Sequence, residues 1–188
     1  MAHWTFHSIS ADNTADWNKI KKHLIGIRKD HNDKKEKFAD FNKLIPMPKA
    51  LLITSGGDSL SEYRKFGRSD KSEQEYFEGL REIGGDKKAL ATAKKVFGAG
   101  SIKYKNCVNL VKYGYKDWYD WRYANWNTKW DGGKVDIDDK TLHIYFETAN
   151  GDARPVIEKL AKLANFVWSF SPEEGGTTEY EAKDGVLE

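Results

Sequence analysis

The chain has 188 residues, of which 39% are hydrophobic, 32% charged and 13% aromatic, and its mean hydropathy is −0.76. Large aromatic side chains build a core from few residues, so this composition argues against a disordered chain. No apolar run approaches the roughly 18 residues that a membrane-spanning helix needs. The opening MAHWTFHSIS also lacks the charged-then-apolar pattern of a secretory signal. We therefore expect a cytoplasmic protein without a membrane segment.

The formal net charge of +2 conceals an uneven distribution along the chain. Residues 1–112 carry 22 Lys and Arg against 14 Asp and Glu, a net of +8, whereas residues 113–188 carry a net of −6. A basic half can attract nucleic acid. Its lysines are arranged as helix-surface residues, however, which favours an ordinary solvated surface. Cys107 stands alone in the sequence beside Val108 and Val111, and this setting predicts a buried thiol and no intrachain disulfide.

The N-terminal segment predicts a strand followed by a helix. Residues 3–10 alternate between two sets of side chains, which is the period of a strand with one buried face. Asn13 or Thr14 can then cap a helix. That helix places three apolar side chains at helical spacing: Trp17, Ile20 and Leu24.

The next segments predict a solvated loop, a strand and a helical insertion. Residues 28–37 are almost wholly charged and indicate a helix end and loop. Residues 37–48 alternate again and predict a strand that stops at its two prolines. Between about residues 50 and 116 the pattern becomes helical, with a helix starting near Ser72, a second starting after Gly84-Gly85 and a third starting near Ser101. We expect these helices to pack against a sheet as an insertion, without forming a separate domain.

The remainder predicts a hairpin, a helix and two further strands. Residues 134–148 form the hairpin around an Asp-Asp-Lys turn, and Pro155 suits the first turn of the helix. Residues 164–171 predict a strand, and residues 177–185 a polar edge strand. The order indicates an α+β fold close to the β-α-β-β-α-β ferredoxin-like pattern, an antiparallel sheet with helices on one face. We expect one domain over residues 1–188.

The segment DWYDWRYANWNTKWDGG, residues 117–133, holds four of the seven tryptophans. Asp117 can cap a helix beginning at Trp118, which places Trp118, Trp121, Arg122 and Asn125 on one face. Two interpretations stay open: a tryptophan-rich core that locks a loop, or a binding surface that stacks a base or grips a peptide. The candidate binding residues are Trp121, Arg122, Asn125, Trp126, Thr128, Lys129 and Trp130.

No other motif in the sequence indicates a catalytic, phosphate-binding or metal-binding site. GAGSIKYK at residues 98–105 lacks the spacing of a phosphate loop and is typical of helix punctuation. The five histidines have no metal-ligand spacing, and no serine or cysteine has a nucleophile's setting. We therefore predict no catalytic residue, no metal and no cofactor.

Three segments resemble the YubB-like proteins, an uncharacterised family carried by phages and plasmids. These segments are DFNKLIPMP (40–48), WRYANWNTKWDGG (121–133) and IYFETANGDARPVIEKLAKL (144–163). The resemblance covers roughly residues 3–185 and is weakest in the helical insertion. It implies a ferredoxin-like domain and a mobile-element origin in a bacterial cytoplasm, and it brings no catalytic residues.

Two positions depart from the family pattern. Asn127 stands where the family usually has the glycine of Asn-Trp-Gly-Thr-Lys-Trp, and we expect the turn to survive because asparagine tolerates a positive φ. Asn150 stands where the family tends to have a tryptophan, and the loss of that tryptophan counts against a shared aromatic pocket.

The sequence thus supports three functional hypotheses. The first is a non-enzymatic accessory protein of a phage or plasmid that binds a host or phage protein. The second is nucleic-acid binding through the Trp/Arg/Lys segment 118–130, with affinity that falls as salt rises. The third, an enzyme acting on a small molecule, needs a closed pocket around residues 121–130. The oligomeric state stays open.

Overall fold

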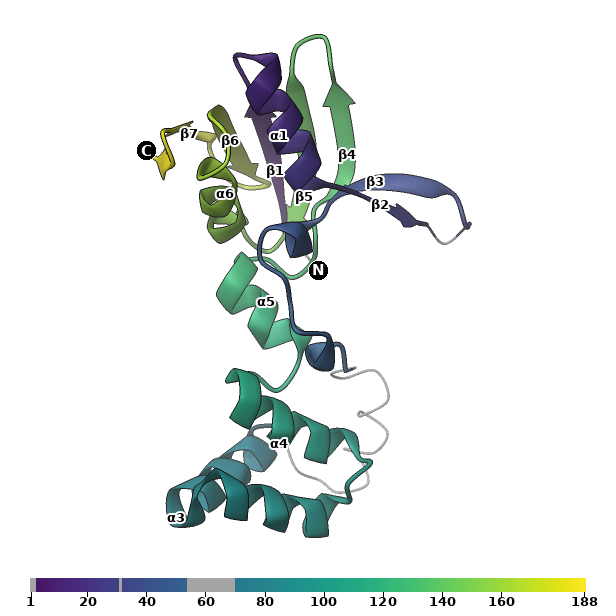
Figure 1. Ribbon diagram of the computed structural model, residues 1–188, viewed down its shortest axis with the longest axis vertical. Helices are drawn as coiled ribbons and strands as arrows, with labels where there is room; N and C mark the ends of the chain where they lie inside the picture. The colour runs from purple at the N-terminus through teal and green to yellow at the C-terminus, as the bar shows by residue number, and fades with distance from the viewer. Residues whose placement is uncertain (1–2, 31, 54–69) are drawn as a thin grey trace. The chain divides into compact units, whose positions relative to one another are not determined.

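The computed structural model describes residues 3–30, 32–53 and 70–188, with residues 70–74 described by their backbone alone (Figure 1). The chain divides into two compact units. The first combines Met1–Pro46 with Arg122–Glu188, and the second is Met47–Trp121. Across the described residues, no helix has the length and apolar character needed to cross a membrane.

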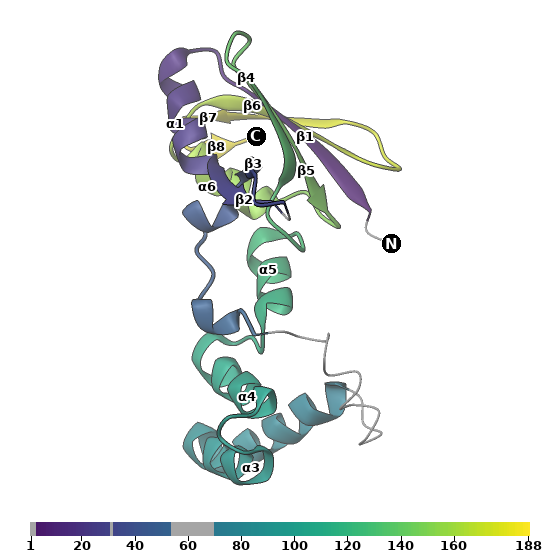
Figure 2. The ribbon, with the colours of Figure 1, turned by 90° about the vertical axis from the view of Figure 1, so that its right-hand side faces the viewer.

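The first unit is built on an antiparallel sheet of six strands in the order β4-β5-β1-β6-β7-β8. The strands are β1 (Trp4–Ser10), β4 (Gly133–Asp138), β5 (His143–Ala149), β6 (Phe166–Pro172), β7 (Thr178–Lys183) and β8 (Val186–Leu187). Helices α1 (Thr14–Leu24) and α6 (Arg154–Ala161) lie on one face of this sheet (Figure 2). The predicted α+β class is therefore confirmed. The strand predicted at residues 177–185 is β7, and the short β8 pairs beyond it as the actual edge.

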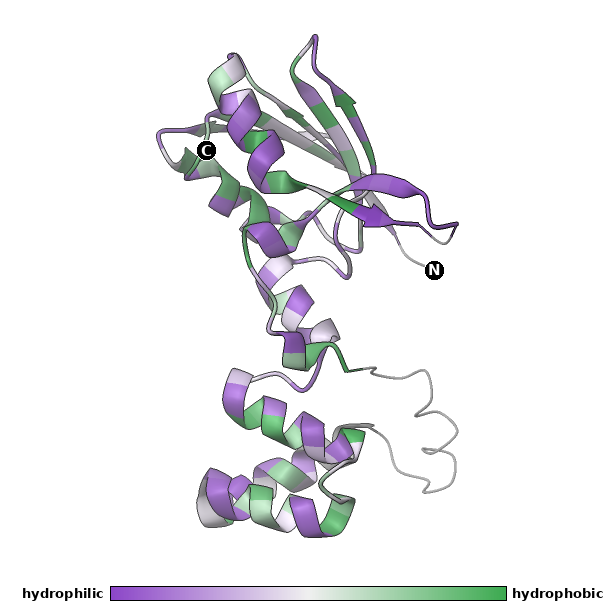
Figure 3. Ribbon diagram, turned by 45° about the vertical axis from the view of Figure 1, so that its right-hand side comes forward, coloured by the Kyte–Doolittle hydropathy of each residue, from purple (hydrophilic) through white to green (hydrophobic). Residues whose placement is uncertain are grey.

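Packing between the sheet and the two helices forms the core of this unit. On β1, Thr5, His7 and Ile9 are buried, and the alternate residues lie on the opposite face. The apolar stripe predicted for α1 is buried, as is that of α6, and Figure 3 shows apolar residues along both helices. These stripes are Trp17, Ile20 and Leu24 on α1, and Val156, Ile157 and Leu160 on α6.

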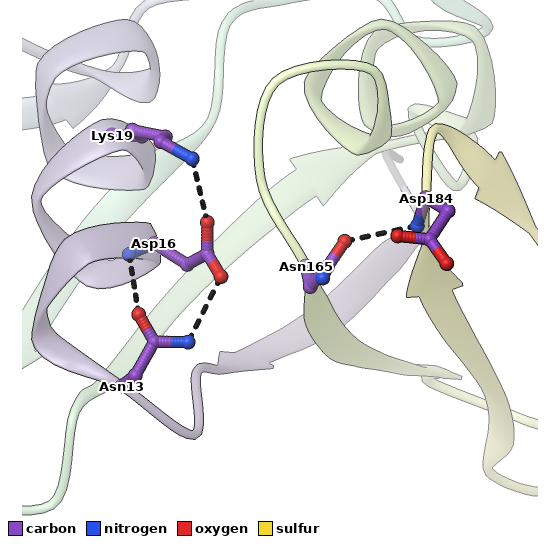
Figure 4. A network of polar contacts seen from close by, with 5 residues as sticks. All are labelled: Asn13, Asp16, Lys19, Asn165 and Asp184. Atoms are coloured by element: carbon purple, nitrogen blue, oxygen red, sulfur yellow. Dashed lines mark hydrogen bonds and ion pairs between the residues drawn. The ribbon is translucent and has the colours of Figure 1, made fainter.

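Polar contacts fix the ends of these elements (Figure 4). Asn13 is the N-cap of α1, and its Oδ1 accepts from Asp16 N at 2.9 Å. Its amide also donates to the Asp16 carboxylate, which together with Lys19 lowers the pKa of Asp16. Asn165 accepts from Asp184 N at 3.0 Å, holding the two-residue turn of left-handed Asp184 and Gly185 between β7 and β8.

The loop predicted at residues 28–37 and the strand predicted at residues 37–48 were only partly right. Strands β2 (Ile25–Lys29) and β3 (Lys35–Ala39) form a separate two-stranded ribbon. Its mixed charges resembled a loop because the outer part of the ribbon has no buried face. The predicted strand stops at Ala39, since Asp40 accepts from Asn42 N and turns the chain into the 3-10 helix η1 (Phe41–Lys43). A second 3-10 helix, η2 (Lys49–Leu51), lies in the other unit.

The described part of the second unit is helical, as predicted for residues 50–116. Helix α3 (Asp70–Phe97) is interrupted at Gly85, whose φ is 69°, and α4 (Ile102–Tyr113) begins after a Ser101 cap. Cys107 is 4% exposed and packs with Phe77, Ala89 and Ala93, which confirms the buried thiol. That the whole chain forms one domain stays a prediction.

Strand β4 is irregular at the sheet edge. Its pairing with β5 shifts register between Gly133 and Asp136, which is a β-bulge. At the opposite edge, β8 has only two residues.

A chain of hydrogen bonds crosses the core through His7. Trp168 Nε1 donates to His7 Nδ1 at 3.2 Å, so Nε2 carries the ring proton and donates to Thr148 Oγ1 at 2.7 Å. The Thr148 hydroxyl donates in turn to Gly151 O at 2.5 Å. The His7 ring also stacks on Phe146 with centroids 4.5 Å apart. Burial lowers the pKa of His7 to about 3, so the ring stays neutral.

This buried histidine predicts acid sensitivity. Below about pH 6.5, His7 is protonated in the unfolded chain but stays neutral in the folded chain. The contribution of His7 to the free energy of unfolding is therefore fully present above that pH and is lost as the pH falls. Between pH 7.5 and 5.0, we expect wild type to lose about 2 kcal/mol of unfolding free energy beyond what His7→Gln loses. Urea unfolding followed by circular dichroism at both pH values measures the difference. Equal losses in the two proteins would contradict it.

Candidate functional site

The aromatic segment begins as the predicted capped helix. Helix α5 spans Trp118–Trp126, and Asp117 Oδ1 accepts from Tyr119 N at 2.9 Å. Asp117 is buried, and this burial raises the pKa of its carboxyl. Trp121 is also buried and belongs to the second unit, whereas the other six candidate residues belong to the first.

Trp126 is a core residue of the first unit. Its side chain is fully buried, and its indole Nε1 donates to Ile45 O at 2.9 Å. The ring meets Phe41 edge-on with centroids 5.7 Å apart, and the Arg122 guanidinium lies 4.9 Å from its centroid. These contacts leave the ring no open face on which a base or a peptide could stack.

Arg122 is half-buried and interacts with groups of its own unit. Besides lying over Trp126, its Nη1 approaches Lys129 O at 3.4 Å. Burial lowers the pKa of Arg122, and the Asp131 carboxylate opposes this. Burial likewise raises the pKa of Asp131, which accepts from Phe41 N at 3.0 Å. The two opposite charges therefore stabilise each other's ionised form, as a structural pair does.

The helix ends in a tight turn at Asn127. Its φ is 55°, as expected from the departure noted in the sequence, and its N–H donates to Tyr123 O at 3.1 Å. The side-chain amide donates to Asp152 at 2.8 Å. Thr128 is fully buried, and its hydroxyl donates to Ala149 O at 2.9 Å. These hydrogen bonds connect the turn to the end of β5 and to the loop that follows it.

Close backbone approaches complete this attachment. A Cβ on Gly151 would lie 1.6 Å from Asn127 O, so a side chain has no room there. Gly132 pairs with Ala39 through hydrogen bonds of 2.9 and 3.0 Å, and a Cβ on Gly132 would lie 2.8 Å from the Ala39 methyl. Asn150, the second family departure, exchanges hydrogen bonds with the His3 backbone. The structural interpretation thus accounts for most of the segment.

Trp130 differs from the rest of the segment. It is 40% exposed, and the Lys129 ammonium lies 4.4 Å from its ring centroid. Asn125 is half-buried on α5. Of the predicted binding residues, Trp126 and Thr128 are enclosed, whereas Trp130 offers a surface that a partner can reach.

A second aromatic surface lies on the sheet, on the side away from α1 and α6. We call it the open face (Figure 2). Phe6 on β1 is 46% exposed and Tyr145 on β5 is 47% exposed. Phe6 pairs with Glu147 and Tyr145 with Ser8, so the two rings are diagonal neighbours on adjacent strands. His143 stacks on Tyr145 with centroids 5.9 Å apart.

The margins of the open face are acidic. Asp136 on β4 lies in register with Tyr145, and Glu179 on β7 lies in register with Ser169. Both are exposed, as are Glu181 and Lys183 on the same side of β7. Glu147 pairs with Lys134 at 3.0 Å, which neutralises one charge. The centre of the face is thus aromatic and serine-rich, between two carboxylate-bearing strands.

Sequence reasoning missed this surface although the signal was present. The alternation of residues 3–10 and 143–147 predicts two faces for each strand, but it does not tell which one the helices cover.

Metal binding was not expected, and in the described part of the chain no group of three or more His, Cys, Asp or Glu side chains could hold an ion.

The different burial of two tryptophans predicts different costs of truncation. Trp126→Ala removes a fully buried ring and should lower the unfolding free energy by about 3–5 kcal/mol. Trp130→Ala removes an exposed ring and should cost less than about 1 kcal/mol. Urea unfolding of both variants tests this, and similar costs would show that the segment is not held as described.

The contact at Gly151 predicts a specific steric penalty. Gly151→Ala should destabilise the protein by about 1–3 kcal/mol or more, because the added methyl collides with Asn127 O. Gly176→Ala is the matched control, since a Cβ there meets nothing within 4 Å. Thermal unfolding compares them, and an unchanged midpoint for Gly151→Ala would refute the close approach.

Comparisons with known proteins found no relative of this chain. No family model matches the chain, and neither a curated protein nor a solved structure does. The resemblance to the YubB-like family stays an expectation that rests on the quoted motifs.

Proposed function

We propose that this chain is a non-enzymatic interaction module, an accessory protein of a phage or plasmid that binds a host or phage protein through the open face. The observation that carries this proposal is the pair of exposed rings, Phe6 and Tyr145, on two central strands. Exposed apolar patches on a folded surface mark interaction sites. Aromatic side chains are also enriched at protein interfaces, and tyrosine is enriched among the residues that contribute most to binding.

The charges around the open face favour a protein partner. Asp136, Glu179 and Glu181 would repel the phosphates of a nucleic acid. A protein surface with lysine or arginine beside apolar groups complements carboxylates around an aromatic centre. The alternative, nucleic-acid binding through residues 118–130, relies on Lys129 and Trp130, because Trp126 is fully buried.

The ferredoxin-like assignment and the mobile-element origin belong to the same proposal. Four adjacent strands in the order β4-β5-β1-β6, with α1 following β1 and α6 linking β5 to β6, support the β-α-β-β-α-β pattern. In this proposal, the segment between α1 and β4 is an insertion, and β7 and β8 extend one edge. The motifs shared with the YubB-like family support the phage or plasmid setting.

Capture from a bacterial lysate tests the proposed surface. A tagged chain should retain a reproducible partner, and Phe6→Ser with Tyr145→Ser should reduce that retention at least tenfold, since hot-spot rings are lost. Leu163→Ser with Ile83→Ser is the control, because these apolar residues are also exposed but do not lie on the open face. The proposal fails if no partner is retained or if both double variants behave alike.

A further inference from the structure

The ribbon of β2 and β3 extends away from the main sheet of its unit. It pairs five positions, from Ile25 with Ala39 to Lys29 with Lys35, as a sheet of its own. Exposure rises along it, from fully buried Ala39 to Ile27 at 68%. Figure 1 shows the ribbon reaching past β4, and Figure 3 shows its mostly hydrophilic surface.

The two faces of this ribbon differ in charge. On one face Arg28 pairs with Glu36 at 2.5 Å, and its guanidinium lies 4.8 Å from the Phe38 ring. The other face, which we call the lysine face, carries four exposed side chains and no carboxylate on either strand. They are Ile27, Lys29, Lys35 and Lys37.

The charge of the lysine face is accessible to a ligand. Lys29 pairs with Asp33 at 3.1 Å, but both side chains are largely exposed, at 68% and 86%. An exposed pair of this kind contributes little and exchanges readily for another anion. Lys22 is exposed in the basic last turn of α1, which leads directly into β2. It adds positive charge at the base of the ribbon.

We propose that the lysine face binds a nucleic-acid duplex, with the ribbon entering the major groove. That groove in B-form DNA is about 12 Å wide and admits a two-stranded β-ribbon. Lys35 and Lys37 lie two residues apart on β3, about 6.6 Å along the strand, which corresponds to two base-pair steps of about 3.4 Å along the duplex axis. Exposed Ile27 lies directly opposite Lys37 and is suited to contact a thymine methyl group.

Other anionic partners fit this face less well. A membrane surface requires a broad apolar face for insertion, and the lysine face offers one isoleucine. A carboxylate-rich protein offers no fixed charge spacing, whereas the phosphates of a duplex repeat at a regular spacing that two neighbouring lysine-bearing strands can follow. Lysine ammonium groups act as point charges, which suits regularly spaced phosphates. The site is separate from the open face, so this inference does not depend on the proposed function.

The binding should be weak, without strong sequence preference, and sensitive to salt. Three lysines neutralising phosphates predict a slope of about −2.7 for the logarithm of the association constant against the logarithm of salt concentration. A 20-base-pair duplex with a fluorescent label, titrated with the full chain at 50 to 200 mM salt, measures affinity and slope by anisotropy.

Two triple variants that remove the same number of positive charges distinguish binding at the ribbon from a general effect of net charge. Lys29→Gln, Lys35→Gln and Lys37→Gln together should weaken duplex binding at least tenfold and remove most of the salt slope. The control replaces three exposed lysines of α3, Lys87, Lys94 and Lys95, by glutamine and should change affinity less than threefold. The replaced side chains are exposed, so circular dichroism should show both variants folded.

Several results would overturn the inference. They are no duplex binding at 50 mM salt, equal losses in the two triple variants, and tighter binding to the matching single strand than to the duplex. Tighter binding to phosphatidylserine vesicles or to polyglutamate than to the duplex would reassign the face to a membrane or an acidic protein. Ile27→Ser should weaken duplex binding severalfold with an unchanged salt slope, and an unaltered affinity would contradict entry of the ribbon into the groove.

Discussion

The pairing of β1 with β5 on one side and β6 on the other is the constraint on which the first unit depends. It joins the first residues of the chain to two strands more than 130 positions later. It also brings Trp168, His7 and Thr148 into one line of hydrogen bonds. The Trp168 indole N–H can only donate, so it requires His7 Nδ1 to accept and fixes the tautomer of the histidine. The register of three strands and this tautomer therefore depend on each other.

The aromatic segment depends on the same sheet. Thr128 and Lys129 both donate to Ala149 O, the last residue of β5, and Gly151 makes room for the turn. Fully buried Trp126 then fixes α5 to the chain after η1 through Ile45. The tryptophans of the segment therefore serve mainly to attach it, because Trp121 and Trp126 are buried and only Trp130 among the four is exposed. Recognition is better sought on the sheet, where aromatic rings are exposed without such a structural role.

The sequence predicted elements whose signals are local. Asn13 and Asp117 cap helices through contacts within three residues, and the positive φ of Asn127 follows from the chemistry of asparagine. The ribbon was missed because alternating charges carry no hydropathy signal when both sides of a strand face water. The open face was missed for a different reason. Trp4 and Phe6 are more apolar than Thr5 and His7, yet the latter are buried, because Ile144, Phe146 and Trp168 of the neighbouring strands share their side. That choice belongs to the whole sheet and cannot be read from one strand.

The two edges of the sheet limit how any partner can approach. The bulge in β4 breaks the regular spacing of backbone groups, and β8 offers only two residues. Neither edge presents a long row of unpaired amide and carbonyl groups on which another chain could add a strand. Growth of the sheet by edge-to-edge association, whether with a second copy or with an extended peptide, is therefore disfavoured. A partner of the main sheet would therefore contact side chains on a face of that sheet and would not pair with the backbone at its edges.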